Sequence, residues 1–420
     1  MQATTERQRL GRRRRLRALL GAAAVVLLAA LASAPSGSRA AVDPPPPPCS
    51  PLLDSGQTRE LNDGTTASSL ALRPGSRLSA VMLFVEFPDL PARDSSRTLY
   101  RQLVPRARRW FAEVSYGRLR LDVTAVERRF RMPRDLPSYG LADGIGWREH
   151  RAYLADAIAS ADEAVDFSRY QVVYVVAPKG TSVERSPAFR AEPGRGIPVD
   201  GAEVRYGATF FEDTKFDPRQ AANVLIHETG HVLGLPDLYD VPHPTFWRLL
   251  RFAGGWDMMS WNGPGAHFLA WQKWKLGWLD PAQLTCLDGP GSRTATLTPL
   301  ERRGGLKAIV VPTGPSSAYV VEARRRIGQD AWLCREGILV YAVDATVPTG
   351  YGPVHIRPAR RGAKAGLLER CGPLYDAPFS VGPGRVARFE DRAAEISVQV
   401  VASGAEGYRV RVVRTSSPPR

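Results

Sequence analysis

The chain contains few cysteines, few lysines and few long apolar runs, and each of these scarcities excludes some classes of protein. Its 420 residues include four cysteines, at positions 49, 286, 334 and 371. These positions lie too far apart for a Cys-rich zinc site, in which paired cysteines stand a few residues apart. Their even number favours two structural disulfides in an exported chain, and all three possible pairings stay open.

The only apolar run long enough to be considered as a membrane-spanning segment lies near the N-terminus. Arg12–Arg15 and Arg17 precede the apolar run Leu19–Leu31, and Ser38–Ala40 comes after it with the small residues of a cleavage site. This is the pattern of a secretory signal peptide over residues 1–40, by either the general or the twin-arginine route. An uncleaved anchor is the alternative, although the run is short for about 30 Å of hydrocarbon. We therefore expect a secreted, extracellular protein without stable membrane association after signal cleavage.

Lysine is scarce although the chain is strongly basic. There are 6 lysines against 51 arginines, and the formal net charge is +15. Residues 1–40 hold eight Arg and one Glu, so removing them leaves +8. The remaining Arg are scattered along the chain rather than gathered into one basic segment. Nucleic-acid binding, which needs a basic face or arm, is therefore not expected.

The length suggests two folded domains after the signal peptide, or one large domain with an appendage. We interpret residues 41–75 as a Pro-rich linker or short pro-segment. Strands and helices alternate from residue 78 to 211, which predicts an α/β (α+β) domain over residues 76–280. Short runs rich in Val, Ile and Tyr then predict a C-terminal all-β, sandwich-like domain over residues 281–420.

Hydrophobic patterning places the individual elements. The expected strands of the first domain are 78–87, 118–126, 172–177 and 206–211, the last beside a cleft at a sheet edge, and the expected helices are 98–114 and 147–164. Residues 178–206 lack a strong apolar period and are predicted to form a long loop. The expected strands of the second domain are 294–297, 307–311, 318–321, 337–343, 396–401 and 408–413.

One helical segment carries the residue types of a catalytic metal site. Asp217 and Pro218 form a helix start signal. His227 and His231 are four residues apart, which puts both imidazoles on one helix face, where they can be two ligands of a zinc ion. Glu228 stands beside the first ligand and is placed to accept a proton from a metal-activated water.

The bend after this helix supplies a third ligand. Gly234 can adopt a left-handed conformation that ends the helix and turns the chain back. That turn would bring Asp237 to the metal and leave the fourth position for water, as in catalytic zinc sites. Asp240 and His243 are the alternatives for the third ligand.

At these residues the chain resembles a known family. His227–Asp240 resembles the signature of the M6 metallopeptidases of the immune inhibitor A type, which belong to the metzincin group. Gly255–Ser260 resembles the family's Met-turn segment, and His267–Trp278 resembles the family's next segment along the chain. Val85–Pro88 and Ser115–Gly117 are further similar landmarks. The resemblance is good over about residues 80–280 and weak beyond.

The resemblance implies a mostly parallel sheet with an antiparallel edge strand above the cleft. It also implies that Met259, with Met258 as the competing candidate, forms an apolar floor beneath the metal ligands. Structural Ca²⁺ fits the resemblance and the acidic loops, although no EF-hand-like spacing occurs. Several metzincins have a Tyr at the position of Trp261, so no oxyanion donor is carried over. His267 is a candidate for that role, and a buried structural His is the other interpretation.

Together these features predict a secreted Zn²⁺-dependent endopeptidase that acts on proteins or peptides, with Glu228 as general base, and we expect a monomer. One alternative is an exported binding or surface protein with a vestigial zinc site and a working β domain. A second alternative is an exopeptidase. Cys49 lies upstream of the catalytic region, where its thiolate could cap the metal until removed. The even cysteine count favours a disulfide there instead.

Overall fold

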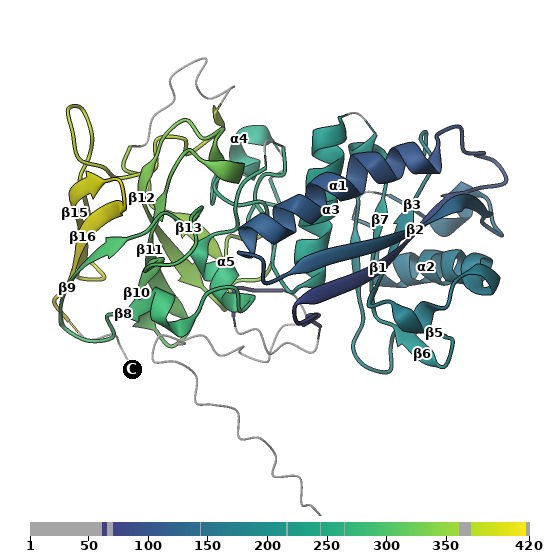
Figure 1. Ribbon diagram of the computed structural model, residues 1–420, viewed down its shortest axis with the longest axis horizontal. Coiled ribbons are helices and arrows are strands. Elements are labelled where there is room, and N and C mark those ends of the chain that lie inside the picture. Colours follow the sequence, from purple (N-terminus) through teal and green to yellow (C-terminus); the bar gives the residue numbers. More distant parts are fainter. Residues whose placement is uncertain are drawn as a thin grey trace, which may run out of the picture. The chain divides into compact units, whose positions relative to one another are not determined.

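The computed structural model describes residues 61–64, 70–142, 144–215, 217–243, 245–263, 265–360 and 371–416. The predicted signal peptide, Cys49 and most of the predicted linker lie outside these ranges. The described residues form one compact unit, in which an α/β half precedes a β-rich half (Figure 1). Within the described ranges, no helix combines the length and the apolar character needed to cross a membrane.

A five-stranded mixed sheet organises the α/β half. Its strand order is β2-β1-β3-β7-β4. The first three pairs are parallel, and β4 pairs with β7 in the antiparallel direction. This agrees with the mostly parallel sheet and antiparallel edge strand that the resemblance implied. The bounds of the strands are β1 Arg77–Glu86, β2 Arg120–Arg131, β3 Val172–Val176, β4 Ala188–Arg190 and β7 Tyr206–Phe210.

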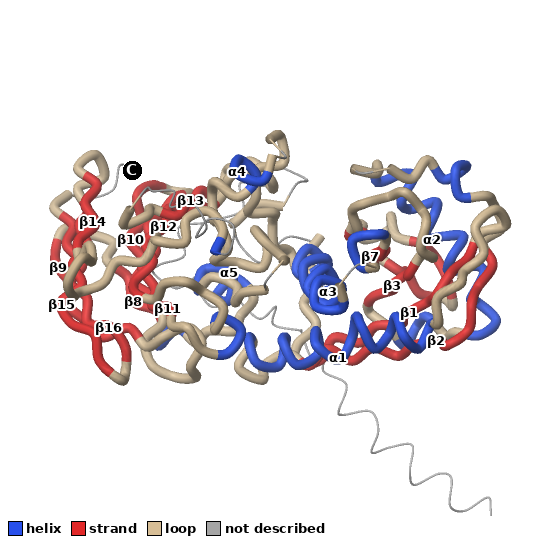
Figure 2. Tube along the Cα trace, turned by 90° about the horizontal axis from the view of Figure 1, so that it is seen from above, coloured by secondary structure: helices blue, strands red, loops and turns tan. Residues whose placement is uncertain are grey.

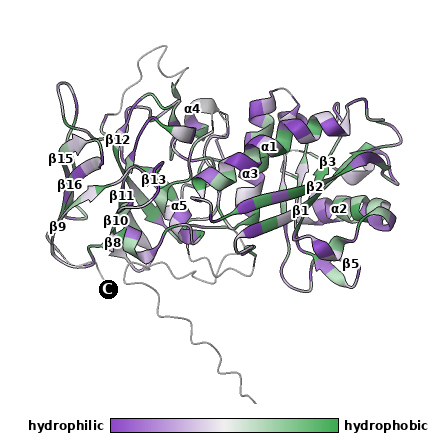
Figure 3. Cartoon of the chain, in the orientation of Figure 1, coloured by the Kyte–Doolittle hydropathy of each residue, from purple (hydrophilic) through white to green (hydrophobic). Residues whose placement is uncertain are grey.

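Helices cover both faces of this sheet, because its strands are apolar on both sides. Along β1, Met82 and Phe84 face the cluster that includes α1 (Ser96–Val114) and α3 (Pro218–Val232). Leu83 lies on the opposite face, in the cluster that includes α2 (Trp147–Ala161). In Figure 3, α1 carries both hydrophilic and hydrophobic residues, as expected for a helix with one buried side.

Two expectations for this half are wrong. The stretch 178–206, expected to be a loop, contains β4 and a hairpin of β5 (Ile197–Val199) and β6 (Ala202–Val204). The strand expected at the sheet edge, β7, is an inner strand, and β4 is the edge. The three residues of β4 are too few for a periodic signal. Contacts from α2 support β4, since the Trp147 indole stacks on Phe189 and donates to the Arg190 carbonyl.

The β-rich half is a sandwich of two sheets, as predicted. The strand orders are β13-β12-β11-β10-β8 and β14-β15-β16-β9, and one apolar cluster between the sheets takes residues from both. The short strands β8, β13 and β14 were not predicted. The bounds are β8 Leu284–Cys286, β9 Gly291–Leu297, β10 Ala308–Gly314, β11 Ser317–Arg324, β12 Gly337–Asp344, β13 Val354–Ile356, β14 Arg388–Asp391, β15 Ile396–Gly404 and β16 Gly407–Arg414.

The five-stranded sheet of the sandwich is buried on both faces. Ile309 and Val321 face the core between the two sheets. Val310 and Val320, one residue along, belong to the same apolar cluster as Leu225 of α3. The hydrophobic core therefore continues across residue 281, where the change from α/β to all-β structure was expected.

The segment between α3 and the sandwich contains two short helices, α4 (Phe246–Leu249) and α5 (Ala270–Lys275). Figure 2 shows α3 between the strands of the α/β half and the β-rich half. Cys334 and Cys371 form a disulfide with a Cα–Cα distance of 5.8 Å. Cys286 is also disulfide-bonded, and no described cysteine is free.

Candidate metal centre

The helix that carries the candidate ligands begins and ends where the sequence predicts. The Asp217 carboxylate accepts the backbone N–H of Arg219 at 2.7 Å, and Pro218 opens the helix. Gly234 has a φ of +96°, which returns the chain along the helix. A Cβ at Gly234 would lie 2.7 Å from that of Ala71, so a side chain there would have to displace the backbone of residues 70–73.

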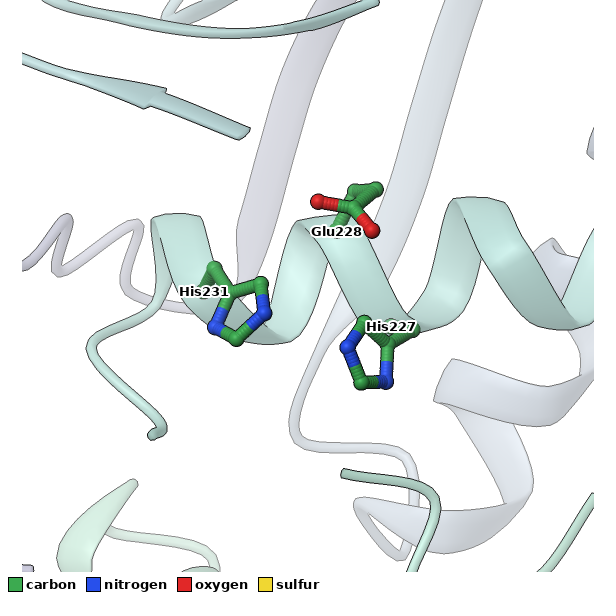
Figure 4. Close-up of side chains that lie close together, drawn as sticks. All are labelled: His227, Glu228 and His231. Atoms are coloured by element: carbon green, nitrogen blue, oxygen red, sulfur yellow. The ribbon is translucent and has the colours of Figure 1, made fainter. Parts of the chain in front are cut away.

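In both histidines, Nδ1 contacts a backbone carbonyl, and Nε2 is the ring nitrogen that a metal ion could bind. Their rings lie one helical turn apart with centroids separated by 4.8 Å (Figure 4). His227 Nδ1 is 3.0 Å from the carbonyl of Met258, and His231 Nδ1 is 2.9 Å from that of Leu235. Because a carbonyl only accepts hydrogen bonds, each Nδ1 carries a proton, and each Nε2 is the atom that a metal ion would bind in place of any proton held there.

Asp237 lies where the turn was expected to bring it. Its Oδ1 is 3.1 Å from Nε2 of His227 and 3.1 Å from Nε2 of His231. Ligands about 2.0–2.1 Å from a tetrahedral zinc ion are about 3.3 Å apart. Two of the three donor–donor distances are therefore close to the spacing of a zinc site, and imidazole and carboxylate are both ligands of zinc.

Electrostatic interactions among these groups shift the pKa values of His227 and Asp237. Burial lowers the pKa of His227, but the hydrogen bond with Asp237 and the charge of Glu228 outweigh it and raise that pKa to about 9. Burial also acts to raise the pKa of Asp237, and the two imidazoles overcome it and keep that pKa low. An ionised carboxylate thus faces two imidazoles, a set of groups whose protons a divalent cation can replace.

Glu228 projects from the turn between the two histidines (Figure 4). Its carboxylate and the ring nitrogens of His227 and His231 all lie within 4.8 Å of one another. Burial raises the pKa of Glu228 well above its usual value, and the charge of His227 opposes this. A raised pKa suits a carboxylate that accepts a proton and later gives it back near neutral pH.

A pocket of about 230 Å³ opens beside His227 and Glu228. Its apolar wall is formed by Leu249, Leu250 and Trp261. Its polar lining residues are Arg185, Ser186, Asp213, Gln220, Tyr239, Ser260 and Asn262. A group bound in this pocket would contact the candidate base Glu228 and one candidate ligand, His227.

The Met-turn candidates lie directly beneath the helix. Met258 and Met259 are fully buried. A Cβ at Gly230 would lie 2.5 Å from the sulfur of Met259, so the thioether packs against the helix between the two histidines. Met258 contributes its carbonyl to His227. The two methionines therefore have different contacts, and of the two it is Met259 whose sulfur lies against Gly230 of α3.

The remaining candidates are not brought to the three donor atoms. Asp240 is buried in an ion pair with Arg251 at 2.6 Å and also contacts His243 at 3.0 Å. His267 is fully buried 2.9 Å from the ammonium of Lys273, and it does not line the pocket. Both side chains are thus engaged in other interactions.

Sequence reasoning missed residues that approach the centre from other parts of the chain. The ring of Tyr239 lies 6.1 Å from that of His227, and the phenol lines the pocket. Arg190 of β4 has a buried Nη1 without a hydrogen-bond partner, and its burial lowers its pKa to about 10 against the charges of Asp237 and Glu228. Thr349 contacts Asp237 from the β-rich half. Only Tyr239 lies inside the motif; the others have no local signal.

Comparisons with known proteins give little. No protein-family model matches the chain, and no curated protein matches it. Among solved structures, the chain is similar to catalytically inactive OgpA from Akkermansia muciniphila in complex with an O-glycopeptide (glycodrosocin) substrate. The identity is 10%, the TM-score is 0.25, and the match covers 83% of this chain and 96% of that one. So distant a likeness adds nothing to the interpretation of the site.

Proposed function

We propose that the chain is a secreted, zinc-dependent endopeptidase of the M6 type. The observation that carries the proposal is the convergence of His227 Nε2, His231 Nε2 and Asp237 Oδ1, with Oδ1 3.1 Å from each nitrogen, beside a buried carboxylate and an open pocket. The signal-like N-terminus and the Cys334–Cys371 disulfide support an extracellular location.

His227, His231 and Asp237 would hold the metal ion. When bound, zinc acidifies a coordinated water and polarises a carbonyl oxygen. Glu228 accepts the proton of the attacking water and delivers it to the amine of the cleaved bond. Its burial raises the pKa of the carboxyl, which makes this carboxylate a better proton acceptor than an exposed one. Met259 fixes the helix from below and takes no part in proton transfer.

Strand β4 is the surface on which we expect the peptide to bind. It pairs with β7 on one side, and no strand among the described residues pairs with its other side. An extended peptide could add to that edge through main-chain groups other than the Arg190 carbonyl, which already accepts the Trp147 indole N–H, and this mode of binding suits cleavage within a flexible segment. Ala188 and Arg190 share the sheet face toward α3, since Phe189 between them packs with the opposite cluster.

The proposal is tested on the purified full-length protein by metal analysis and casein hydrolysis. We expect about one zinc per chain, loss of hydrolysis with a chelator and its return with added zinc. Peptides blocked at both ends should be cleaved as well as free ones, which separates an endopeptidase from an exopeptidase. A folded protein that retains no zinc and hydrolyses no peptide bond would refute the proposal and favour a binding function for the β-rich half.

A further inference from the structure

Asp237 is held by a residue that lies 112 positions further along the chain. Its backbone N–H donates to the hydroxyl of Thr349 at 2.8 Å, and the same hydroxyl lies 3.3 Å from Asp237 Oδ2. The backbone N–H of Gly350 donates to the Asp237 carbonyl at 3.0 Å. Thr349 and Gly350 belong to the turn between β12 and β13, so the β-rich half reaches the metal centre.

These contacts give each carboxylate oxygen of Asp237 its own partner. Oδ1 faces both imidazoles, and Oδ2 faces the Thr349 hydroxyl. The terminal torsion of an Asp side chain is otherwise broad. The hydroxyl therefore restricts rotation of the carboxylate and keeps Oδ1 directed at the point where the three donors meet. Groups that orient a metal ligand in this way contribute strongly to metal affinity.

Thr349 is in turn held by Leu61–Asp63, which we name the N-terminal strap. The Thr349 N–H donates to the Leu61 carbonyl at 2.6 Å, and Asn62 forms a β-bridge with Pro348. Further along the strap, Asp63 is fully buried. It accepts Gln272 Nε2 at 2.7 Å, and its carbonyl accepts the Trp271 indole N–H at 3.1 Å.

The strap lies inside the stretch 41–75 that was expected to be a linker or pro-segment. Residues shortly after it also support the active-site helix, since Leu72 N–H donates to the Val232 carbonyl at 2.9 Å and Arg73 donates to that of Leu233 at 2.7 Å. A removable segment would not be expected to make buried contacts with α5 and with the turn that orients a ligand.

We propose that Thr349 is a positioning residue for the metal ligand Asp237, and that the N-terminal strap is a permanent part of the mature enzyme because it holds Thr349 in place. This inference rests on the proposed function. It also places any maturation cleavage upstream of Leu61, and it predicts that a cut between Asp63 and Gly75 would weaken metal binding.

The first test compares Thr349→Val, Thr349→Ser and Thr346→Val in the full chain. Valine keeps the shape without the hydroxyl, and serine restores the hydroxyl. Thr346 is a matched control, because its hydroxyl donates to Asp344 in the same turn at 2.6 Å. We expect the zinc affinity of Thr349→Val, measured by competition with a chromogenic chelator, to be about 10- to 100-fold lower than that of the wild type. Thr349→Ser and Thr346→Val should bind zinc with near wild-type affinity.

A second measurement separates positioning from general stability. The unfolding midpoint of the metal-free Thr349→Val protein should fall only by the cost of the hydrogen bonds that the hydroxyl makes with Asp237, and the midpoint of the zinc-loaded protein should fall further, because zinc binds the folded variant less tightly. Unchanged zinc affinity in Thr349→Val, or an equal loss of stability with and without metal, overturns the inference alone. If the wild type itself binds no zinc, the proposed function fails and the inference fails with it.

The strap is tested on the secreted protein as it is produced. N-terminal sequencing and mass spectrometry of the active form should give a first residue at or before Leu61. An active form that begins after Asp63 and binds zinc with the affinity of the longer chain overturns the role of the strap.

Discussion

Two of the clusters of buried ionisable groups among the described residues differ in their surroundings. In the candidate metal centre, Asp237 Oδ1 lies 3.1 Å from Nε2 of His227 and of His231, and a pocket of about 230 Å³ opens beside His227 and Glu228. In the second cluster the guanidinium of Arg324 is fully buried against three carboxylates. Both contain groups with strongly shifted pKa values, such as Glu228 and His267, and burial is the largest cause in each.

The Arg324 cluster is closed. The guanidinium contacts Glu301, Glu322 and Asp330 at 3.2, 3.0 and 2.5 Å, and all four side chains have 0% exposure. Arg324 also donates to the carbonyl of Trp256, just before the two methionines beneath the active-site helix. The difference teaches that a shifted pKa does not identify a reactive site. Candidate ligands that lie close together beside an open pocket are the stronger reason to propose one.

The largest effect is expected from a change of Glu228, the candidate general base of the candidate metal centre. Glu228→Gln keeps the size of the side chain and removes its ability to accept a proton. We expect proteolysis to fall at least about 10²-fold, and up to about 10⁴-fold, with zinc content unchanged. The measurement is kcat/KM on a blocked peptide beside metal analysis of the same sample.

Glu163→Gln is the control, because this glutamate is exposed outside both clusters. It should leave kcat/KM unchanged. Full activity in Glu228→Gln would remove Glu228 from the proposed mechanism, and loss of zinc would show that it helps to hold the metal instead.

The closed cluster should respond in stability. Arg324→Met leaves three buried carboxylates without their cation, and removing one partner from a buried ion pair typically lowers the unfolding free energy by about 3–5 kcal/mol. Denaturant unfolding of the metal-free protein measures it. Arg392→Met is the control, since that side chain is 92% exposed and should change stability by less than about 0.5 kcal/mol. A loss below about 1 kcal/mol for Arg324→Met would mean that the cluster is not a structural unit.

The contrast between the clusters also explains what could be read from the sequence. The candidate ligands lie between His227 and Asp237, where helix geometry and one glycine turn decide their relative positions. Spacing alone could therefore bring them together. The strands of the sandwich were found for a similar reason, because runs of Val and Ile give a local signal.

Residues joined only by tertiary contacts gave no such signal. Thr349 meets Asp237 across 112 positions, and Arg324 collects carboxylates from separate segments. Strand β4 is too short to show a period and depends on contacts from Trp147. His267 could be a candidate only while its neighbours were unknown; beside Lys273 it belongs to the closed cluster.

A third kind of buried group, a neutral histidine, should give a pH effect of intermediate size. Burial lowers the pKa of His150 to about 3, and its Nε2 is 2.9 Å from the Thr209 hydroxyl. Below pH about 6.5 the unfolded chain takes up a proton at this residue that the folded chain does not. This group should therefore lower the free energy of unfolding by up to about 1.4 kcal/mol for each unit by which the pH drops below about 6.5.

His150→Gln tests this, because an amide retains a hydrogen-bonding group without the imidazole proton. Unfolding free energies between about pH 4 and 7 should depend less steeply on pH in this variant than in the wild type. Thr209→Val is the control, since it removes the same hydrogen bond and should lower stability while keeping the wild-type slope. Equal slopes for wild type and His150→Gln would show that the histidine is not buried in its neutral form.

The smallest effect concerns the wall of the open pocket. Trp261 lines it, and Gly372, next to the disulfide-bonded Cys371, packs against the indole, since a Cβ at Gly372 would lie 2.5 Å from the ring. Trp261→Ala should enlarge the pocket and shift preference toward larger side chains beside the cleaved bond. We expect the ratio of kcat/KM for Phe- and Ala-containing peptides to rise about tenfold, within the range for pocket contacts, while zinc affinity stays unchanged. Trp332→Ala, whose ring packs edge-on against Trp261 at 5.9 Å but does not line the pocket, should change the ratio less. An unchanged ratio in Trp261→Ala would place the substrate side chain elsewhere, because a wall that the substrate touches cannot be removed without altering which residues fit.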